Sequence, residues 1–476
     1  MAGFVAIDLG AESGRAMLGR IDERGLRLQE IARFANVPAR LPAGLYWNSI
    51  GILTRIIDAL RICSTECAIV PDGIAVDSWG VDFGLLASDG SLVESPRHYR
   101  DPRTEGMLEA TFARVPRRAI YERTGIQFLR LNTLYQLHAM TRAGAPSLAV
   151  AHKLLFMSDL FTYWLTGEMR CEITLASTSQ FYDPRARRWA TDLLQAIGAP
   201  PSLPANLVEP GTRMGALLPH IAESCKLPAN VPVYATASHD TASAVVAAPA
   251  AGDDWCYISS GTWSLMGVEV PEPIINDQAL ELGFTNEVGF GGRIRLLKNI
   301  PGLWLIQECR KDWALAGRDY SYQQLAEMAA ECAETDISIE PRAFDRPGHM
   351  PQQIAEYCAR TGQRVPQSPG EVCCVILQSL ARTYAGVLGD LEALLGRRIG
   401  LIHIVGGGSR NALLNQMTAN ATGRTVVAGP AEATAAGNIL VQAIAAGVIG
   451  SLGEARALVR RSFPLTTFTP GGQHFV

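Results

Sequence analysis

A strand-turn-strand pattern that occurs twice, half a chain apart, constrains the fold more than any other feature of this sequence. Residues 4–19 consist of an apolar run, a Gly/Ser turn and a second apolar run, and residues 255–267 have the same outline. Aligned at a constant offset of 251 residues, the two copies share the pairs Ile7/Ile258, Gly10/Gly261 and Ser13/Ser264. Three matches in seven positions can arise by chance, but the shared pattern and the half-chain offset favour an internal duplication.

The duplication sets the domain organisation. The length of the chain corresponds to roughly three ordinary domains, and the repeat reduces these to two lobes of one architecture. We place the boundary near Pro249, with lobes at 1–248 and 249–476. Strand-like runs at 73–77 and 401–405 are followed by Asp- or Gly-containing turns, which is typical of α/β sheets that bind ligands at the carboxyl ends of their strands. The sequence therefore predicts an α/β fold of two lobes with a cleft between them.

Other patterns extend this prediction. Residues 81–93 are expected to form a second hairpin that turns at Asp89-Gly90. Helical spacing recurs between 104 and 194, for example over 131–137 and 154–161. Further along the chain we expect these elements: a strand over 231–238 leading into an Ala-rich helix, a helix over 411–421, a strand over 425–428 and a final helix.

Charge and composition point to a small-molecule partner. The 46 acidic and 42 basic residues give a net charge of −4 without long runs of either sign, so nothing favours a nucleic acid or an anionic membrane as partner. The first residues lack a basic segment and include Asp8, unlike a signal peptide. The longest uncharged stretch, 433–453, is interrupted by Asn438 and Gln442, as in a buried helix. We therefore expect a cytoplasmic protein.

The cysteines do not indicate a metal site. There are ten, without a C-x-x-C pair and without a histidine at zinc-ligand spacing. Buried reduced thiols are the favoured interpretation, and a disulfide between Cys358 and Cys374 stays open.

Two turns have the composition of phosphate-binding loops. In the first, from Gly10 to Arg15, backbone N–H groups and a guanidinium could converge on a phosphate, although an ordinary β-turn is an equally good interpretation. Asp8, just before it, could hold Mg²⁺ through water. Glu12 argues against a phosphate unless its side chain points away. The second turn, around Thr262, is a candidate phosphate-binding loop only because it repeats the first.

A glycine triplet, 406–408, follows a strand and would allow close approach of a flat ligand. It does not match G-x-G-x-x-G, and no Walker sequence occurs in the chain, so dinucleotide-binding and P-loop classes are disfavoured.

Asp240 lies where a strand passes into a helix, beside His239 and Thr241. A carboxylate in this position could accept the proton of a hydroxyl that attacks phosphorus. Taken alone, the local sequence favours a helix N-cap instead. The segment 77–82 places two carboxylates and a tryptophan together, as a polyol site might, although polar residues in a turn would explain it equally well.

The order of these motifs along the chain resembles the FGGY carbohydrate kinases, which belong to the actin/Hsp70/hexokinase superfamily. The resemblance covers essentially the whole chain and rests on these segments: 8–15, 77–83, 99–103, 124–128, 132–137, 238–245, 259–267, 297–300 and 403–408. It implies two ribonuclease H-like lobes with ATP in the cleft between them. Segments 77–83, 124–128 and 238–245 together resemble the branch of the family that acts on L-rhamnulose.

The resemblance also implies roles for single residues. Asp240 would be the general base for the 1-hydroxyl of the ketose, and Asp8 the carboxylate that holds Mg²⁺ through water. The implied sugar-binding residues are Gly80, His239, Asp240, Thr241 and Asn299. The implied ATP-binding residues are Ala11, Glu12, Ser13, Gly14 and Arg15 in the first turn, and Thr262, Gln307 and Gly407 in the second half.

Three alternatives stay open. The substrate could be a related ketose or polyol such as L-fuculose, L-xylulose or glycerol. An actin- or Hsp70-like conformational ATPase would share the nucleotide site, but it has no use for sugar-site segments. A sugar-binding regulator without catalysis is disfavoured because the candidate base and both phosphate turns are intact.

Overall fold

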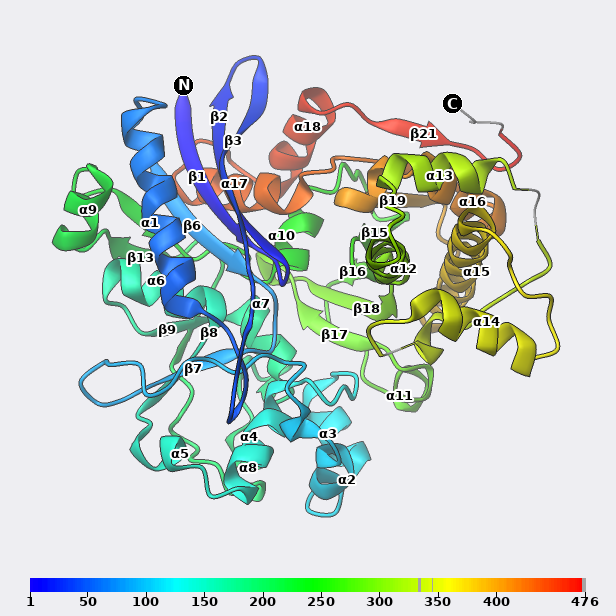
Figure 1. The fold of residues 1–476 in the computed structure, drawn as a ribbon. Helices are drawn as coiled ribbons and strands as arrows, with labels where there is room; N and C mark the ends of the chain where they lie inside the picture. The colour runs from blue at the N-terminus through cyan, green and yellow to red at the C-terminus, as the bar shows by residue number, and fades with distance from the viewer. Residues whose placement is uncertain (333–334, 345, 473–476) are drawn as a thin grey trace. The chain divides into compact units, whose positions relative to one another are not determined.

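The computed structural model describes residues 1–332, 335–344 and 346–472. These residues form two compact α/β units (Figure 1). The first unit contains 1–247, 269–296 and 433–462, and the second contains 248–268, 297–432 and the segment from Phe463 onward. The C-terminal part of the chain thus contributes two helices to the first unit.

A six-stranded sheet forms the centre of the first unit. Its strands, in spatial order, are β13 (Arg213–Ala216), β14 (Pro232–Tyr234), β6 (Gly73–Ser78), β1 (Ala2–Leu9), β2 (Ser13–Asp22) and β3 (Gly25–Ala35). Strands β1, β6 and β14 run parallel, whereas β1, β2 and β3 form an antiparallel meander. The three parallel strands therefore end at the same edge of the sheet, which is where the sequence places its candidate carboxylates.

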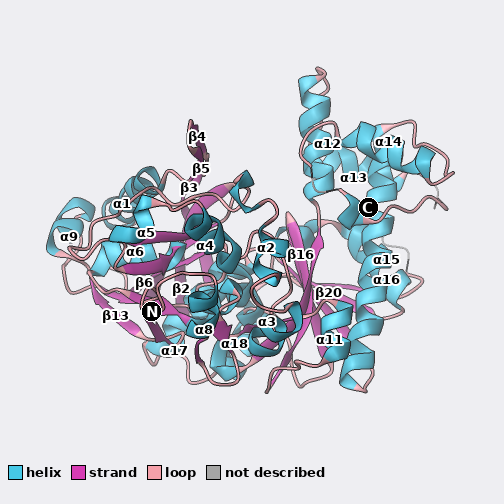
Figure 2. Cartoon of the chain, turned by 90° about the horizontal axis from the view of Figure 1, so that it is seen from below, coloured by secondary structure: helices cyan, strands magenta, loops and turns pink. Residues whose placement is uncertain are grey.

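The two faces of this sheet are covered by different helices (Figure 2). On one face, alternate residues Val5, Ile7 and Leu9 share a core cluster with residues of α1 (Ser49–Thr65) and α6 (Met157–Thr166). On the other face lies α17 (Ala433–Ala445), whose Ile439 fills the space above Gly19 of β2. Two further helices of this unit matter below: α10 (Asp240–Val246) and α18 (Leu452–Ser462). Burial of both faces explains the nearly continuous apolar run of β1.

A seven-stranded sheet has the spatial order β17-β18-β16-β15-β19-β20-β21. Its strands are β17 (Thr285–Val288), β18 (Ile294–Pro301), β16 (Trp263–Val270), β15 (Trp255–Ser260), β19 (Leu401–Val405), β20 (Thr425–Ala428) and β21 (Thr466–Phe468). The hairpin β15-β16 continues into the parallel strands β19 and β20, just as the hairpin β1-β2 continues into β6 and β14. The same local topology in both sheets supports the internal duplication.

The helices of the second unit are α12 (Trp304–Leu315), α13 (Tyr322–Ala330), α14 (Met350–Arg360), α15 (Pro369–Leu395) and α16 (Ala412–Thr422). By length and composition alone, α15 could cross a membrane, and it is the one such helix among the described residues. However, 67% of its most apolar window is buried inside the structure, as in the core helix of a soluble protein. The uncharged stretch that we expected to form a buried helix does so in α17 (Ala433–Ala445).

Three local predictions were partly wrong. The strand expected over 231–238 is confined to β14 (Pro232–Tyr234). The expected helix over 154–161 begins only at Met157, because the preceding residues form β8 (Lys153–Phe156), which pairs with β7 (Phe83–Leu86). A short apolar run suits a strand as well as a helix, and only the partner decides. The hairpin over 81–93 makes its turn at Asp89-Gly90, but its second arm forms one isolated bridge, Leu86 with Leu92, rather than a strand.

The remaining elements of the first unit are short and lie mostly between 39 and 282. The strands are β4 (Ala39–Leu41), β5 (Gly44–Tyr46), β9 (Arg170–Glu172), β10 (Tyr182–Asp183), β11 (Arg188–Trp189) and β12 (Asn206–Val208). The helices are α2 (Met107–Phe112), α3 (Arg117–Thr124), α4 (Thr133–Arg142), α5 (Pro146–Val150), α7 (Ile173–Ala176), α8 (Thr191–Ala196), α9 (Pro219–Cys225) and α11 (Asp277–Leu282).

The cysteines are free thiols, as the favoured interpretation has it. All ten lie among the described residues; eight are buried, and Cys67 and Cys332 are half-buried. Cys358 and Cys374, the pair left open above, are both free. The described residues also contain no cluster of three or more His, Cys, Asp or Glu side chains suited to a metal ion.

Candidate active site

Three carboxylates lie at the ends of three neighbouring parallel strands of the first unit. Asp8 of β1 and Asp77 of β6 are register partners. The next strand along, β14, leads to His239, which forms a parallel bridge with Ser78 of β6. Asp240 follows as the first residue of α10. Three separate sequence segments, around Asp8, Asp77 and Asp240, are thereby brought to one edge of the sheet.

Asp77 is the most deeply buried of the three carboxyl groups. Its Oδ2 accepts a hydrogen bond of 2.6 Å from Nδ2 of Asn438 in α17, and its Oδ1 is buried without a hydrogen-bond partner. Burial raises the pKa of Asp77 well above its usual value, and the nearby charge of Asp8 raises it further. Asp8 itself forms an ion pair with Arg15 of β2. The site therefore contains a carboxyl group that favours its neutral form beside a carboxylate that is paired with a cation.

The first phosphate turn joins β1 to β2. The backbone N–H of Gly10 donates to the carbonyl of Ser13 at 2.9 Å. Asn36 fastens the turn from the side, because its backbone N–H donates to Glu12 O and its side-chain amide to Gly10 O, both at 3.0 Å. Gly14 is required by packing, since a β-carbon there would overlap the ring of Phe34. Glu12, at the tip of the turn, is exposed.

The second phosphate turn, in the second unit, supports the start of α12. The backbone N–H groups of Gly302 and Leu303 donate to the carbonyls of Thr262 and Gly261, at 3.1 and 3.0 Å. Gln307, the predicted nucleotide contact, lies one helical turn further along α12 and is half-buried. Its side-chain Oε1 is buried and has no hydrogen-bond partner. An unpaired buried acceptor of this kind is expected where a ligand or water completes the site.

The glycine triplet combines two packing glycines with one open glycine. Gly406 has φ of +83°, a conformation that favours glycine, and a β-carbon at Gly408 would overlap the hydroxyl of Ser260. Gly407 is exposed, and a β-carbon there would meet nothing within 4 Å. The triplet passes first into a single 3₁₀ turn, Gly407–Arg410, before α16 begins. The middle glycine is thus the one at which a flat ligand can approach the backbone.

Gly80, a predicted sugar-binding residue, precedes a strained turn. The N–H of Asp82 donates to the carbonyl of Gly80 at 2.9 Å, which closes a three-residue turn around Val81. Val81 has φ of +70°, rare for a β-branched side chain. Two hydroxyl groups from other elements fix the turn. The N–H of Val81 donates to the hydroxyl of Thr178 at 3.2 Å, and the carbonyl of Val81 accepts from the hydroxyl of Thr133 at 2.7 Å. Strain of this kind persists where surrounding contacts impose it, and it is frequent at functional sites.

The contacts of Asp82 argue against a role for its carboxylate in binding a polyol. Its carboxylate accepts hydrogen bonds from the indole N–H groups of Trp47 and Trp79, the backbone N–H of Tyr99 and the side-chain amide of Gln136, at 2.6 to 3.1 Å. It is fully buried, and burial raises its pKa to about 6. All these donors belong to the protein, so Asp82 organises the surrounding chain rather than a sugar.

Asp240 is not the N-cap of α10, which is the alternative that the local sequence favours. The N-cap is His239, and Asp240 is the first helical residue. Oδ1 of Asp240 accepts from the N–H of Thr241 at 2.5 Å and from its hydroxyl at 3.1 Å. The described part of the chain offers Oδ2 no donor. One oxygen is therefore fixed by the protein, and the other is available for a proton.

Asn299 of β18, the remaining predicted sugar-binding residue, lies in the second unit and is half-buried. Its carbonyl accepts from the guanidinium of Arg342 at 3.3 Å. The preceding residue, Lys298, forms an ion pair of 2.8 Å with Asp390. These contacts fix the backbone on both sides of the Asn299 amide.

Two residues that were not among the predicted site residues fix the backbone just before Asp240. Glu172 of β9 accepts a hydrogen bond of 3.1 Å from the N–H of Ser238. The hydroxyl of Thr174 accepts one of 3.0 Å from the N–H of His239. Both immobilise the chain just before Asp240. For Asn438 a signal existed, because an amide in an otherwise apolar helix usually has a buried partner. For Glu172 and Thr174 no local pattern exists.

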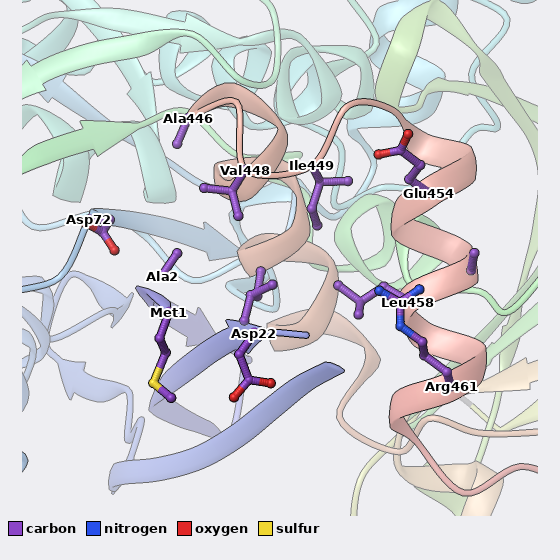
Figure 3. A pocket seen from close by; sticks show the side chains of 12 residues that line it. Met1, Ala2, Asp22, Asp72, Ala446, Val448, Ile449, Glu454, Leu458 and Arg461 are labelled. Carbon is purple, nitrogen blue, oxygen red and sulfur yellow. The ribbon is translucent and has the colours of Figure 1, made fainter. Parts of the chain in front are cut away.

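A surface hollow of about 850 Å³ lies elsewhere on the first unit (Figure 3). It is lined by the start of β1, the end of β2, the segment 446–449 that follows α17, and residues of α18, with Asp22, Asp72, Glu454 and Arg461 as its charged groups. Asp72 already accepts from Gly3 N–H and Glu454 from Gly450 N–H, both at 2.8 Å. None of the predicted site residues line this hollow.

Solved structures with the same fold are sugar and polyol kinases. Gluconate kinase from Lactobacillus acidophilus superposes with a TM-score of 0.79 at 14% identity, covering 99% of this chain and 94% of that one. Glycerol kinase from Plasmodium falciparum, determined with ADP, gives a TM-score of 0.79 at 13% identity, with the same coverage of 99% and 94%. The predicted α/β class with two lobes is confirmed.

The chain belongs to the FGGY family of carbohydrate kinases. The N-terminal domain of that family matches residues 4–247, and the C-terminal domain matches 256–446. The chain is 45% identical to a rhamnulokinase from Bacteroides thetaiotaomicron over 469 residues, which is 98% of this chain and 96% of that protein. It is 41% identical to a rhamnulokinase from Bacillus subtilis, over 98% of this chain and 95% of that one. The family resemblance inferred from the motifs is confirmed, and the protein is a carbohydrate kinase.

Proposed function

We propose that this kinase transfers the γ-phosphoryl group of ATP to the 1-hydroxyl of L-rhamnulose, giving L-rhamnulose 1-phosphate and ADP, as a step of L-rhamnose catabolism. The observation that carries the proposal is the identity of 41 to 45% with two rhamnulokinases along nearly the whole chain. We further propose that the protein acts in the cytoplasm, without nucleic-acid or membrane partners.

Asp240 acts as the general base. Its Oδ2 takes the proton of the attacking hydroxyl, while Thr241 fixes Oδ1 so that the free oxygen keeps its direction. Gly80, His239, Thr241 and Asn299 bind the sugar. The strained turn after Gly80 supports this assignment, because it holds the glycine backbone in a set orientation.

ATP is bound by Ala11 to Arg15 through the first turn, and by Thr262, Gln307 and Gly407 in the second half of the chain. The unpaired Oε1 of Gln307 and the open space at Gly407 support these two contacts. In this reading residues 1–248 provide the sugar site, the first phosphate turn and the base. Residues 249–476 provide the second phosphate turn and the glycines beside the adenosine.

The carboxylates at the sheet edge of the first unit suit a Mg²⁺ ion that keeps most of its water ligands. Asp8 offers a hard oxygen, and the orphaned Oδ1 of Asp77 lies on the neighbouring strand, but no cluster of three metal ligands occurs among the described residues. Such a site is normal for an ion that arrives with phosphate groups. Bound there, Mg²⁺ would screen the charge of the phosphates. Asp8 would hold it through water, and Arg15 would keep Asp8 oriented.

A panel of sugars tests the proposal. The protein is incubated with Mg-ATP and, separately, with L-rhamnulose, L-fuculose, L-xylulose and glycerol, and ADP release is followed. We expect ADP release to be fastest with L-rhamnulose and to stop at background without sugar. Faster turnover with another member of the panel would reassign the substrate. Sugar-independent turnover would point to a conformational ATPase instead.

A further inference from the structure

A buried ion pair contacts the imidazole of His239. It consists of Glu287 on β17 and Arg295 on β18, joined by a hydrogen bond of 2.9 Å from Nη2 to Oε2. The imidazole Nδ1 of His239 lies 3.0 Å from the same Nη2 and 3.2 Å from the same Oε2. Arg295 is 0% exposed and Glu287 is 5% exposed. The three side chains therefore form a closed triangle from which solvent is excluded.

The pair is charged in spite of its burial. Burial pushes the pKa of Glu287 upward, but the charge and the hydrogen bond of the adjacent Arg295 counter this, and the pKa of Glu287 is below its usual value. Nη1 of Arg295 is buried without a hydrogen-bond partner among the described residues. An ion pair in this environment adds little net stability compared with apolar residues of the same size. A role beyond stability therefore needs to be considered.

The contacts of the imidazole favour one tautomer. With the proton on Nε2, Nδ1 accepts from Arg295, and the protonated Nε2 lies 3.4 Å from the Asp240 carboxylate oxygen Oδ1. With the proton on Nδ1, the Nδ1–H would face the N–H donors of Arg295, and the lone pair of Nε2 would face the Asp240 carboxylate. Only the contact from Nδ1–H to Glu287 would then be favourable. A doubly protonated ring would place a second cation 3.0 Å from Arg295. In the Nε2–H form the lone pair of Nδ1 lies 3.2 Å from Oε2 of Glu287, but the guanidinium Nη2 donates to both atoms and offsets this repulsion, so the form needs no second cation beside Arg295.

This tautomer completes the environment of the proposed base. Oδ1 of Asp240 accepts two hydrogen bonds, both from Thr241, and faces Nε2 of His239 at 3.4 Å, whereas Oδ2 receives no donor from the described residues. The carboxylate cannot rotate without losing these contacts. Its other oxygen, Oδ2, is consequently held in a fixed orientation.

We propose that Arg295 and Glu287 are positioning residues, which act through His239 on the base Asp240. Arg295 holds Nδ1 as an acceptor, so the imidazole proton resides on Nε2. Glu287 orients the guanidinium and balances its charge. The inference rests on the proposed function in one respect, the role of Asp240 as base. The tautomer of His239 does not depend on that role and can be measured without turnover.

The test replaces the ion pair by apolar residues, because removal of one partner would leave a buried charge and prevent folding. The test variant is Glu287→Leu with Arg295→Met. The control is Glu269→Leu with Arg456→Met, which removes a pair of 2.7 Å with side chains that are 5% and 11% exposed. Arg456 also contacts α10, through the carbonyl of Val245, but at the far end of the helix. A third variant, Arg295→Lys, keeps a cationic donor next to Glu287.

Two readouts are taken from each variant. The first is the tautomer of His239 in the substrate-free protein, from long-range ¹H–¹⁵N correlation spectra of protein labelled at histidine, with the signal assigned by its loss in His239→Gln. The second is kcat and KM for sugar and ATP. We expect the wild type and the control to show the Nε2–H form. In the test variant we expect a mixture of forms and a kcat lowered by about 10- to 100-fold, with KM for ATP unchanged. Arg295→Lys should restore both properties in large part.

The proposal is overturned if the test variant retains the Nε2–H form, or if its kcat equals that of the control. It is also overturned if the wild type carries the proton on Nδ1. Failure of the proposed function gives a distinguishable result, because the wild type would then phosphorylate none of the sugars. The tautomer measurement would still decide the role of Arg295 in that case. Thermal unfolding of both double variants separates loss of positioning from loss of fold.

Discussion

Gly408 faces the hydroxyl of Ser260 on the neighbouring strand so closely that a β-carbon at Gly408 would overlap it. A β-carbon at its neighbour Gly407 would meet nothing within 4 Å. Two adjacent glycines in one turn therefore serve different purposes, the first in packing and the second in access to a ligand.

This difference predicts opposite effects of alanine at the two positions. Gly408→Ala should lower the free energy of unfolding by about 1 to 3 kcal/mol, because the strand and the turn must separate. Gly407→Ala should leave stability unchanged and weaken ADP binding, because a methyl group then occupies the ligand's side of the turn. Thermal unfolding and calorimetric titration with ADP measure the two effects. Equal ADP affinity of Gly407→Ala and wild type would remove Gly407 from the site.

Asp240→Asn should retain the fold and ADP affinity but lose turnover. The amide cannot accept the proton of the attacking hydroxyl, and loss of a general base lowers kcat by about 10²- to 10⁴-fold. Asn can still accept from Thr241 through its carbonyl oxygen, so the start of α10 should stay intact. The measurement is kcat at saturating ATP and sugar. Turnover near the wild-type rate would exclude Asp240 as the base.

Glu172 should make stability depend on pH. Burial raises its pKa to about 7 from 4.5, so the folded protein binds the proton more tightly than the unfolded chain. The stability contributed by the neutral carboxyl is fully present below pH 4.5 and is lost as the pH rises to about 7. Relative to wild type, Glu172→Gln should thus gain up to about 3 kcal/mol across this interval. Urea unfolding at a series of pH values measures it.

The control for this experiment is Glu122→Gln, whose side chain is 57% exposed and whose curve should run parallel to that of wild type. A constant difference between Glu172→Gln and wild type at every pH would show that Glu172 titrates alike in the folded and unfolded chains.

Val81→Gly should be tolerated better than a comparable change in the core. Glycine adopts a φ of +70° freely, so the substitution releases strain of about 1 to 3 kcal/mol that offsets part of the lost burial. Val76 of β6 is buried to the same degree, 1% exposed against 8%, but lies in regular strand geometry. Val76→Gly is therefore the matched control. If both variants lose equal stability in chemical unfolding, the turn at Val81 is not strained.

The thiols should be protected in the native protein. Burial raises the pKa of Cys63 and Cys225 to about 11, and only Cys67 and Cys332 among the ten cysteines are half-buried. At pH 8 we expect a thiol reagent to modify at most two groups rapidly in the native protein. After unfolding without reductant, all ten should react. Eight would indicate a disulfide, with Cys358 and Cys374 as the first pair to examine.

Local sequence patterns determined much of the secondary structure around the site. The apolar runs and the Gly/Ser turns at 4–19 and 255–267 predicted both hairpins, because alternation and turn residues act over a few positions. Strand-like runs that end on Asp or Gly likewise predicted α/β sheets with ligands at the carboxyl ends of their strands. The order of the motifs along the chain, through its resemblance to a family, predicted the class of enzyme.

Tertiary structure alone decided which of these polar residues are free to act. Asp77 and Asp82 look alike in sequence, yet Asp77 keeps one oxygen without a partner, whereas Asp82 is bound by donors from Trp47, Trp79, Tyr99 and Gln136. The amide of Asn438 reaches Asp77 from 361 positions away. Contacts of this kind depend on how distant segments pack, and no short-range pattern encodes them. The same holds for Arg295 and Glu287, whose closeness to His239 exists only in the folded chain.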